Sequence, residues 1–575
     1  MQPPSAPLAG AQPSFSELFT PKLVTVLREG YGWEAFRRDS ISGLTVAIVA
    51  LPLSMAIAIA SGASPERGLF TAIVGGFLVS ALGGSRFQVG GPAGAFIVLV
   101  AAAVDRHGIE GVMLATAMAG IFLTLAGLLR LGTFIKFIPY PVTVGFTAGI
   151  AVIIFASQIK DLFGLTLPGK EPGEFIAKIE ALSGAFGTAN PAAVALALLS
   201  IALIALTKRL RPHWPGMLIA VVVAAVGTWA LGLPVETIGS RFGGIPSVLP
   251  APALPAFSLE KVQAVLPDAV AFALLGAIES LLSAVVADGM TGRRHRSNCE
   301  LVAQGVANVG SSLFGGIPVT GTIARTATNV RSGARGPVAG MMHAVFLLLF
   351  MLIAAPLASY IPLAALAGVL TVVAWNMAEK HEFATLLRSS RGDAVVLLAT
   401  FLLTVFRDLS EGIVVGFALG AVLFIRRMAI ATGVEAQVPL VPADQADNAS
   451  PRQPYDSSLA TAEDVVVYRL SGAFFFGTAS TLNSVLDRIA DRHRAFVIDF
   501  SAVPFVDSTA AKVIAAIAGK AGRHKVRVYV TGATPAVRHA LLAAGARRPE
   551  VRYRRRIEDA VNEARAVPEG EPARV

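Results

Sequence analysis

Two charged residues in this 575-residue chain stand inside apolar stretches where they could do chemistry. Glu279 lies near the middle of the apolar run 271–290, where an ionised carboxylate is expensive unless it is paired or lines a watery cavity. Ser283 follows four residues later and shares the same helical face. We therefore expect Glu279 to carry a proton, with a structural hydrogen bond to a neighbouring helix as the alternative.

A second acid, Asp288, is not expected to belong to the same site. It lies nine residues after Glu279, which is about 900° of helical rotation and hence the opposite face. It is also close to the basic end of the run. We expect it to cap the helix or to pair with Arg293 or Arg294.

Arg325 is the cationic counterpart, in a threonine-rich stretch that follows a run of glycine and proline at 315–321. The segment 88–104 has the same character, since glycine and proline occupy its first half. The two segments fall third in the two halves of the hydrophobic part of the chain. Short interrupted segments at matching positions are typical of the midplane site of a transporter, although kinked spans or re-entrant linkers would look alike.

Two half-helices whose N-termini point at one place would suit an anion, because free N–H groups and positive dipole ends meet there. The guanidinium of Arg325 would add a fixed charge for a carboxylate or a sulfate. Alternatively, Arg325 neutralises Glu279 or snorkels. Both interpretations hold together if protonation loosens a Glu–Arg pair and so couples a proton to the anion.

The composition places these residues in a membrane. Charged residues make up 15% of the chain and hydrophobic residues 54%, against about 25% charged residues in soluble domains. Windows such as 44–60 and 191–207 are long enough to cross a bilayer. We expect between twelve and fourteen crossings from about residue 40 to 428. Disorder is excluded, and a soluble enzyme of this composition is improbable.

Residues that would indicate catalysis are missing from the sequence. The eight histidines have no metal-ligand spacing, no P-loop lysine is present, and Cys299 is the single cysteine. We expect no enzyme, no metal and no cofactor. Lys and Arg concentrate in alternate loops, so the positive-inside rule places both termini in the cytoplasm. The net charge of +10 therefore reflects the basic residues of the cytoplasmic loops, and no nucleic-acid partner is expected.

The character of the chain changes after residue 427. We expect a cytoplasmic segment at 1–38, a transmembrane domain at 39–430, a linker at 431–462, a small α/β domain at 463–565 and a tail at 566–575. Strands are predicted at 465–470, 496–500 and 526–531, alternating with helices at 479–489, 509–521 and 535–544. The charged stretch from residue 552 is expected to fray.

Several motifs resemble the SulP family of anion transporters, the group related to prestin and pendrin. They are PLSMAIA at 52–58, AIESLLSAVVADGMTG at 277–292, ELVAQGVANV from 300 and GGIPVTGTIARTATNVRSG from 315, in the order of the family. PFVDSTAA at 504–511 is similar to the start of a helix in STAS domains. Together the resemblances cover most of the chain.

The resemblance implies a polytopic helical fold of fourteen transmembrane helices, arranged as two inverted repeats of seven that form core and gate domains, followed by a cytoplasmic STAS domain. The third and tenth helices would meet head to head around the anion. Carried over by position, the substrate-binding residues would be Ser54, Ala93, Gly94, Ala95, Ala324, Arg325 and Thr326. Glu279 matches the acidic position that serves cation coupling, and a glutamate there resembles the proton-coupled members.

The motif runs look most like bacterial carriers of C4-dicarboxylates, while sulfate and bicarbonate carriers share the scaffold. We expect a proton-coupled symporter of a bacterial inner membrane that works by elevator-like alternating access. An uncoupled exchanger or channel, or an anion sensor, is the alternative. The expected partners are the anion, protons, the lipid bilayer, a second copy of the chain and a cytoplasmic protein bound by the STAS domain.

Two positions depart from the family pattern. Leu53 stands where many members have glutamine, which leaves Ser54 or backbone groups to line the pocket. Ala510 stands where STAS domains often have glycine. Ser508, beside Asp507, corresponds to a serine that is phosphorylated in related anti-sigma-factor antagonists. Here we expect it to cap a helix.

Overall fold

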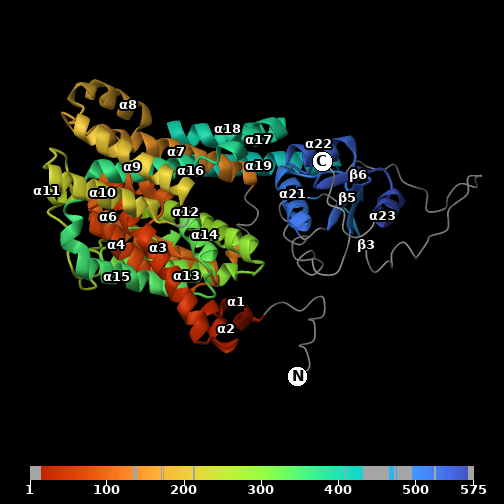
Figure 1. Ribbon diagram of the computed structural model, residues 1–575, viewed down its shortest axis with the longest axis horizontal. Coiled ribbons are helices and arrows are strands. Elements are labelled where there is room, and N and C mark those ends of the chain that lie inside the picture. Colours follow the sequence, from red (N-terminus) through yellow and green to blue (C-terminus); the bar gives the residue numbers. More distant parts are fainter. Residues whose placement is uncertain are drawn as a thin grey trace, which may run out of the picture. The chain divides into compact units, whose positions relative to one another are not determined.

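The structure is a computed structural model of the whole chain. It describes residues 14–133, 139–169, 171–172, 174–211, 214–407, 409–431, 465–471, 474, 495–523 and 526–566. The linker predicted at 431–462, the helix predicted at 479–489 and the tail at 566–575 lie almost entirely outside these residues. Figure 1 shows the arrangement of the helices and strands along the chain.

The first half of the membrane part runs from two short N-terminal helices to a short helix that precedes the second half. Its elements are α1 (Phe15–Phe19), α2 (Lys22–Arg28), α3 (Trp33–Ala60), α4 (Pro65–Phe70), α5 (Gly76–Leu82), β1 (Gly90–Gly91), α6 (Ile97–Leu128), α7 (Tyr140–Phe163), α8 (Phe175–Gly184), α9 (Pro191–Leu210), α10 (Gly216–Leu231) and α11 (Ile238–Phe242). A π-helical turn at Thr71–Gly75 joins α4 to α5.

The second half repeats the opening order of a long helix, a second helix and an interrupted segment. Its elements are α12 (Leu259–Thr291), α13 (Ser297–Leu313), β2 (Thr320–Gly321), α14 (Ile323–Arg331), α15 (Val338–Ala358), α16 (Leu363–Met377), α17 (Lys380–Ser389), α18 (Arg391–Phe406) and α19 (Leu409–Ala431). The matching order of the two halves agrees with the expected internal repeat.

Seven helices of the described part are long and apolar enough to cross a membrane. They are α3, α6 with the turn before it, α7, α9, α12, α15, and α16 together with α17. Helix α6 is broken once at Gly108, whose φ of 67° is non-helical, so that it forms two successive helical segments. The predicted helical membrane fold with a C-terminal α/β domain is confirmed.

Helix α12 is longer than the apolar run 271–290 that predicted it. It begins where the Ser258 hydroxyl accepts a hydrogen bond from the N–H of Lys261, at 3.2 Å. It ends at Gly292, whose φ of 71° is the left-handed conformation of a helix C-cap. Residues 259–270, which precede the apolar run, therefore belong to the helix as well.

The C-terminal domain is a parallel four-stranded sheet in the order β3-β4-β5-β6. Its elements are β3 (Val465–Ser471), β4 (Ala495–Ala502), α21 (Ser508–Arg523), β5 (Arg527–Thr531), α22 (Pro535–Ala543), β6 (Val551–Arg554) and α23 (Ile557–Ala566). The three predicted strands are present. The expectation of a frayed stretch from residue 552 was wrong for residues 552–566, because β6 pairs with β5 and α23 packs its apolar face on the sheet. The rest of that stretch lies outside the described residues.

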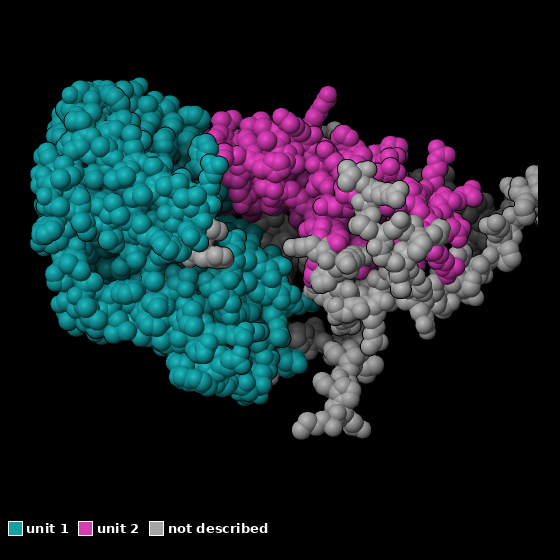
Figure 2. Space-filling view, viewed as in Figure 1, with its two compact units in different colours: residues 1–136, 147–378, 404–410 teal, residues 137–146, 379–403, 411–575 magenta. Residues whose placement is uncertain are grey.

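By its internal contacts the chain divides into two units, which Figure 2 draws in teal and magenta. The first contains residues 1–136, 147–378 and 404–410. The second contains residues 137–146, 379–403 and 411–575, so it joins the end of the membrane part to the C-terminal domain. Every residue predicted to bind the anion or the proton belongs to the first unit.

Candidate functional site

The two interrupted segments meet in a two-residue antiparallel ladder. Gly90 of β1 pairs with Gly321 of β2, and Gly91 pairs with Thr320. Just beyond the ladder, the N–H of Thr322 donates to the carbonyl of Val89 at 3.1 Å. Because the strands run in opposite directions, the helices that follow them start from opposite sides of one junction. This is the head-to-head geometry that the matching glycine and proline runs predicted.

Each segment turns into a helix directly after its strand. Ala93 precedes the turn Gly94–Phe96 that opens α6, and Thr322 precedes Ile323, the first residue of α14. The first N–H groups of a helix have no acceptor within it, so both starts present donors. Ala93 and Ala95 are buried, whereas Ala324 is exposed. The predicted backbone positions thus lie at one junction, and Ala324 is the position among them that is exposed to solvent.

Arg325 is buried beside this junction. Its Nη2 donates to Ser54 Oγ at 3.0 Å and to the carbonyl of Pro92 at 3.3 Å. Its Nε and Nη1 are buried without a hydrogen-bond partner. Among the described residues, none forms an ion pair with Arg325. Ser54 and Arg325 are therefore brought together, and the alternative in which Arg325 neutralises Glu279 does not occur in this structure.

Glu279 lies on the face of α12 that contacts the second segment. Three residues before it, the carbonyl of Gly276 accepts a hydrogen bond from the Thr320 hydroxyl at 3.2 Å. Four residues after it, Ser283 Oγ lies 3.0 Å from Thr326 Oγ1. Residues at this spacing share one helical face, so Glu279 faces β2 and the start of α14. Its carboxylate has no hydrogen bond or ion pair among those of the described residues.

Thr326 holds the junction together with its side chain. Its hydroxyl oxygen accepts a hydrogen bond from the N–H of Val89 at 3.2 Å and contacts Ser283. The sequence placed Thr326 among the substrate-binding residues but did not indicate Val89, which takes part through its backbone. An isolated apolar residue before a glycine pair carries no signal of that kind.

The glycines of the ladder leave room for two buried polar side chains. A Cβ on Gly91 would lie 1.8 Å from Arg325 Nη1, and a Cβ on Gly321 would lie 1.5 Å from Gln88 Nε2. Gln88 is buried, and neither of its side-chain polar atoms has a partner. Sequence reasoning missed Gln88, although a polar residue two positions before a glycine pair in an apolar region is a signal that could have found it.

Asp288 is outside this site, as predicted, but its partner differs. Its carboxylate accepts hydrogen bonds from the backbone N–H of His295 at 3.0 Å and contacts His295 Nδ1 at 2.6 Å. The prediction of Arg293 or Arg294 as the partner was wrong. The turn that begins at Gly292 brings the imidazole of His295 back to the helix end, and its ring and backbone N–H satisfy the carboxylate together.

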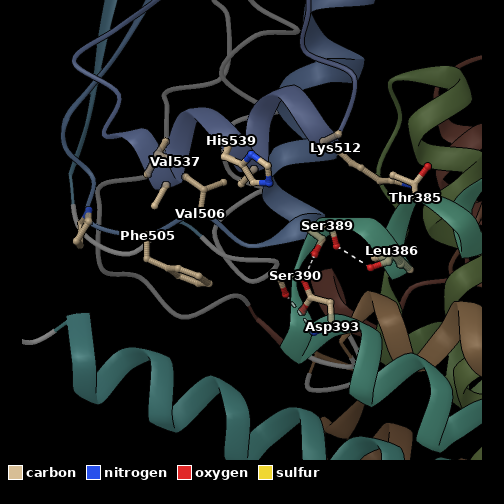
Figure 3. A pocket seen from close by; sticks show the side chains of 15 residues that line it. Thr385, Leu386, Ser389, Ser390, Asp393, Phe505, Val506, Lys512, Val537 and His539 are labelled. Carbon is tan, nitrogen blue, oxygen red and sulfur yellow. Dashed lines mark hydrogen bonds between the residues drawn. The ribbon is translucent and has the colours of Figure 1, made fainter.

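A separate cavity of about 290 Å³ lies within the second unit, between α17, the start of α18 and the C-terminal domain (Figure 3). Asp393 and Ser390 line one side of it, and His539 and Lys512 line the other. None of the residues predicted for transport lines this cavity. The anion site is thus to be sought at the ladder and not here.

The start of α21 also borders this cavity. The carboxylate of Asp507 accepts a hydrogen bond from the N–H of Ala510 at 2.7 Å, so Asp507 is the helix cap. The prediction that Ser508 caps the helix was wrong, because the carboxylate one residue earlier takes that bond. Ser508 donates instead to the carboxylate of Asp393 in the first turn of α18.

Comparisons with known proteins agree with this architecture. The pattern of the Sulfate permease family matches residues 36–400, and that of the STAS domain matches residues 457–564. The chain is 41% identical over 509 residues to "Putative sulfate transporter YvdB" of Bacillus subtilis, covering 88% of this chain and 93% of the relative. It is 31% identical over 522 residues to "Bicarbonate transporter BicA" of Picosynechococcus, covering 88% and 90%.

Solved structures share the fold. The transmembrane domain of a cyanobacterial bicarbonate transporter BicA matches with a TM-score of 0.61 and 32% identity, over 66% of this chain and 98% of that one. The inward-facing murine anion transporter Slc26a9 matches with a TM-score of 0.67 over 98% of this chain and 97% of that one; at 18% identity it shows the fold alone. The chain therefore belongs to the sulfate permease family of membrane anion transporters and carries a C-terminal STAS domain.

Proposed function

We propose that the protein is a proton-coupled symporter that carries a small divalent anion bound at the β1–β2 junction. The observation that carries the proposal is the buried guanidinium of Arg325, which has no acidic partner among the described residues and lies where two helices begin. A buried cation without a counter-charge is strongly unfavourable unless an anion binds beside it. The site is therefore suited to an anion that enters and leaves.

The charges at the junction indicate which anions suit it. Each helix N-terminus acts as about half a positive charge, so two of them with Arg325 provide about two. This sum matches a dicarboxylate or sulfate when Glu279 is protonated. An ionised Glu279 on the adjacent face of α12 would remove about one charge and weaken the binding of a divalent anion. Proton binding and anion binding then support each other, which is the basis of symport.

Fumarate or succinate is the first substrate class that we propose, because the runs 277–292 and 323–333 resemble C4-dicarboxylate carriers. Sulfate is the second candidate, supported by the name of the relative that is 41% identical. Bicarbonate is named for the BicA relatives, but its single negative charge balances only about half of the positive charge at the junction. An uncoupled exchanger or channel remains the rival mechanism on the same scaffold.

The remaining assignments complete the proposal. The chain resides in a bacterial inner membrane. Because Lys and Arg concentrate in alternate loops, the positive-inside rule places both termini in the cytoplasm. Glu279 is protonated from outside, and anion and proton are released inside by elevator-like alternating access. The STAS domain supports a homodimer or binds a cytoplasmic regulatory protein.

The test is uptake into proteoliposomes that contain the purified protein, under an inward proton gradient. Labelled fumarate, sulfate and bicarbonate are compared with and without a protonophore. We expect accumulation of a divalent anion that the protonophore abolishes. Uptake of sulfate alone would replace the dicarboxylate by the second candidate, whereas flux that does not respond to the gradient would refute proton coupling. Arg325→Leu should bind neither divalent anion, while the exposed Arg331→Leu in the same helix is the matched control.

A further inference from the structure

The stretch of chain that leads into β2 is bound by side chains of neighbouring helices. Residues 316–319 are buried and have no regular secondary structure, and Val319 is followed directly by Thr320 of β2. A backbone N–H or C=O without a partner is costly in a membrane interior. The backbone of this stretch must therefore find its partners outside a helix or a sheet.

An asparagine of α13 binds both backbone groups of Val319. The N–H of Val319 donates to Asn308 Oδ1 at 3.0 Å, and Asn308 Nδ2 donates to the carbonyl of Val319 at 2.8 Å. A residue of a neighbouring strand would offer the same pair of acceptor and donor. Asn308 Nδ2 also donates to the carbonyl of Gln304, one turn earlier on α13, at 2.8 Å, which fixes the orientation of the amide.

Two hydroxyl groups bind the backbone of Ile317, two residues earlier. Its N–H donates to Thr71 Oγ1 at 2.8 Å, and its carbonyl accepts from Ser311 Oγ at 2.8 Å. Thr71 belongs to the π-helical turn after α4, and Ser311 follows Asn308 by three residues on α13. Asn308, Ser311 and Thr71 are nearly or completely buried. Four backbone groups before β2 are thus bound by three side chains, two of which come from α13.

Helix α13 also packs against α6, the helix that begins at the first interrupted segment. A Cβ on Gly305 would lie 2.5 Å from the carbonyl oxygen of Gly120, and a Cβ on Gly120 would lie 2.6 Å from the carbonyl oxygen of Gly305. The two backbones therefore approach so closely that only glycine fits. Because Gly305 and Asn308 lie about one turn apart, one short part of α13 contacts both the helix after the first segment and the chain before β2.

We propose that Asn308 is a positioning residue, which fixes β2 on α13 and so directs the first N–H groups of α14 at the anion. The inference rests on the proposed function and adds a residue that acts through the backbone of β2. Val319 lies three residues before Thr322, whose N–H donates to the carbonyl of Val89 and after which α14 begins. A shift at Val319 therefore displaces both the ladder and the start of α14. Donors that are already in place bind a ligand more tightly, so loss of the anchor should weaken binding more than it slows the transport step.

The experiment compares Asn308→Leu with Asn298→Leu in proteoliposomes of the full-length protein. Asn298 is an equally buried asparagine of α13, but its Oδ1 accepts a hydrogen bond from the N–H of Gly132 at 3.1 Å. The KM and kcat for labelled fumarate and sulfate are measured at one pH. We expect the KM of Asn308→Leu to rise on the order of tenfold and its kcat to stay within about threefold of the wild type, because two backbone groups lose their partners. Asn298→Leu should keep the wild-type KM.

Hydrogen exchange of the same two variants shows which part of the chain each one loosens. Asn308→Leu should accelerate exchange at residues 317–322 and leave residues 131–133 unchanged, and Asn298→Leu should do the reverse. If both variants accelerated the same residues to the same extent, the specific link between Asn308 and β2 would be refuted.

A milder pair of variants keeps the proposal testable if Asn308→Leu does not fold. Ser311→Ala removes the bond to Ile317, whereas Ser312→Ala, equally buried on α13, removes a bond to the carbonyl of Val309 at 2.8 Å. We expect Ser311→Ala to raise the KM about threefold and Ser312→Ala to leave it unchanged. A wild-type KM in whichever of Asn308→Leu and Ser311→Ala folds would overturn the inference. Failure of the proposed function would appear instead in the wild type, as uptake that ignores the proton gradient or as no uptake of either anion.

Discussion

Glu279 and Arg325 lie at the same junction without binding each other. Arg325 donates to Ser54 and Pro92, while Glu279 faces β2 and α14 from α12. If the two side chains formed an ion pair, that ion pair would have to dissociate before either group could bind a ligand. Because they are separate, an anion can bind beside the guanidinium and a proton can bind the carboxylate, and each event changes the field that the other meets.

Replacing Glu279 by glutamine tests the role of the carboxylate. Glutamine keeps the shape of the protonated side chain but cannot release a proton. We expect Glu279→Gln to exchange internal for external anion at near wild-type affinity, and to lose accumulation driven by a proton gradient. The measurement is counterflow against net uptake in proteoliposomes. Glu260→Gln, at the exposed start of the same helix, should behave like the wild type; gradient-driven accumulation by Glu279→Gln would contradict the coupling role.

A buried carboxylate in the C-terminal domain has a structural role. Burial tends to raise the pKa of Asp499, but hydrogen bonds from Ser501, Arg469 and Thr531 outweigh it, so the pKa lies below its ordinary value. A group whose pKa is lowered by folding stabilises the fold above its unfolded pKa of about 4, and this contribution is lost as the pH falls through the folded value.

Asp499→Asn should therefore destabilise the sheet at neutral pH, by about 1–3 kcal/mol for the lost charged acceptor. Hydrogen exchange of residues 495–502 in the full-length protein should become on the order of tenfold faster at pH 7. The difference from wild type should persist down to about pH 5 and shrink below about pH 4. Glu550→Gln, at an exposed position, is the control. If the difference in exchange rate between Asp499→Asn and the wild type grew as the pH fell, the stabilising role of the ionised Asp499 carboxylate would be refuted.

At the scale of elements, the ladder depends on glycine because buried side chains occupy the space of a Cβ. We expect Gly91→Ala to displace the guanidinium of Arg325, whose Nη1 would lie 1.8 Å from the new atom. A side-chain end can move, so the protein should fold, but the KM of the anion should rise on the order of tenfold, about 1.4 kcal/mol in binding. Uptake kinetics and the yield of monodisperse protein are the measurements.

Two other glycines provide controls of opposite kind. A Cβ on Gly68 would meet the backbone carbonyl of Ser54 at 2.0 Å, where α4 packs on α3, and backbone cannot move aside. Gly68→Ala should fail to accumulate as folded protein. Gly227 has nothing within 4 Å of its Cβ position, so Gly227→Ala should be neutral. If Gly91→Ala transports with the wild-type KM, the position of Arg325 does not matter for binding.

The interrupted segments were predictable because glycine and proline at 90–94 and 315–321 end regular structure in apolar surroundings. The positions of Glu279 and Arg325 were predictable for a related reason, since charge is rare in such stretches. The partner of Asp288, the cap of α21 and strand β6 were not. They depend on contacts that hydropathy does not report. The turn after Gly292 brings His295 to Asp288, the Asp507 carboxylate takes the capping bond in place of Ser508, and the charged strand β6 pairs with β5.

At the scale of the whole molecule, the C-terminal domain and the last membrane helices form one unit. Ser508 of α21 donates to Asp393 of α18, and Lys512 Nζ donates to Tyr140 Oη at 2.9 Å and pairs with Glu382 of α17. Tyr140 begins α7, a helix that continues from the second unit into the first. A change at α21 can therefore reach a helix shared by both units.

Placing a negative charge at Ser508 should separate the domain from these helices. Ser508→Asp sets one carboxylate against Asp393, whereas Ser508→Ala removes one hydrogen bond, worth about 1 kcal/mol. We expect hydrogen exchange of residues 380–403 in the full-length protein to accelerate strongly in Ser508→Asp and slightly in Ser508→Ala. Ala516→Asp, exposed on the same helix, adds the same charge away from the contact and should leave exchange unchanged. Because α7 reaches both units, the rate of anion uptake should change in Ser508→Asp as well; unchanged exchange at 380–403 would show that the contact does not hold the domain in place.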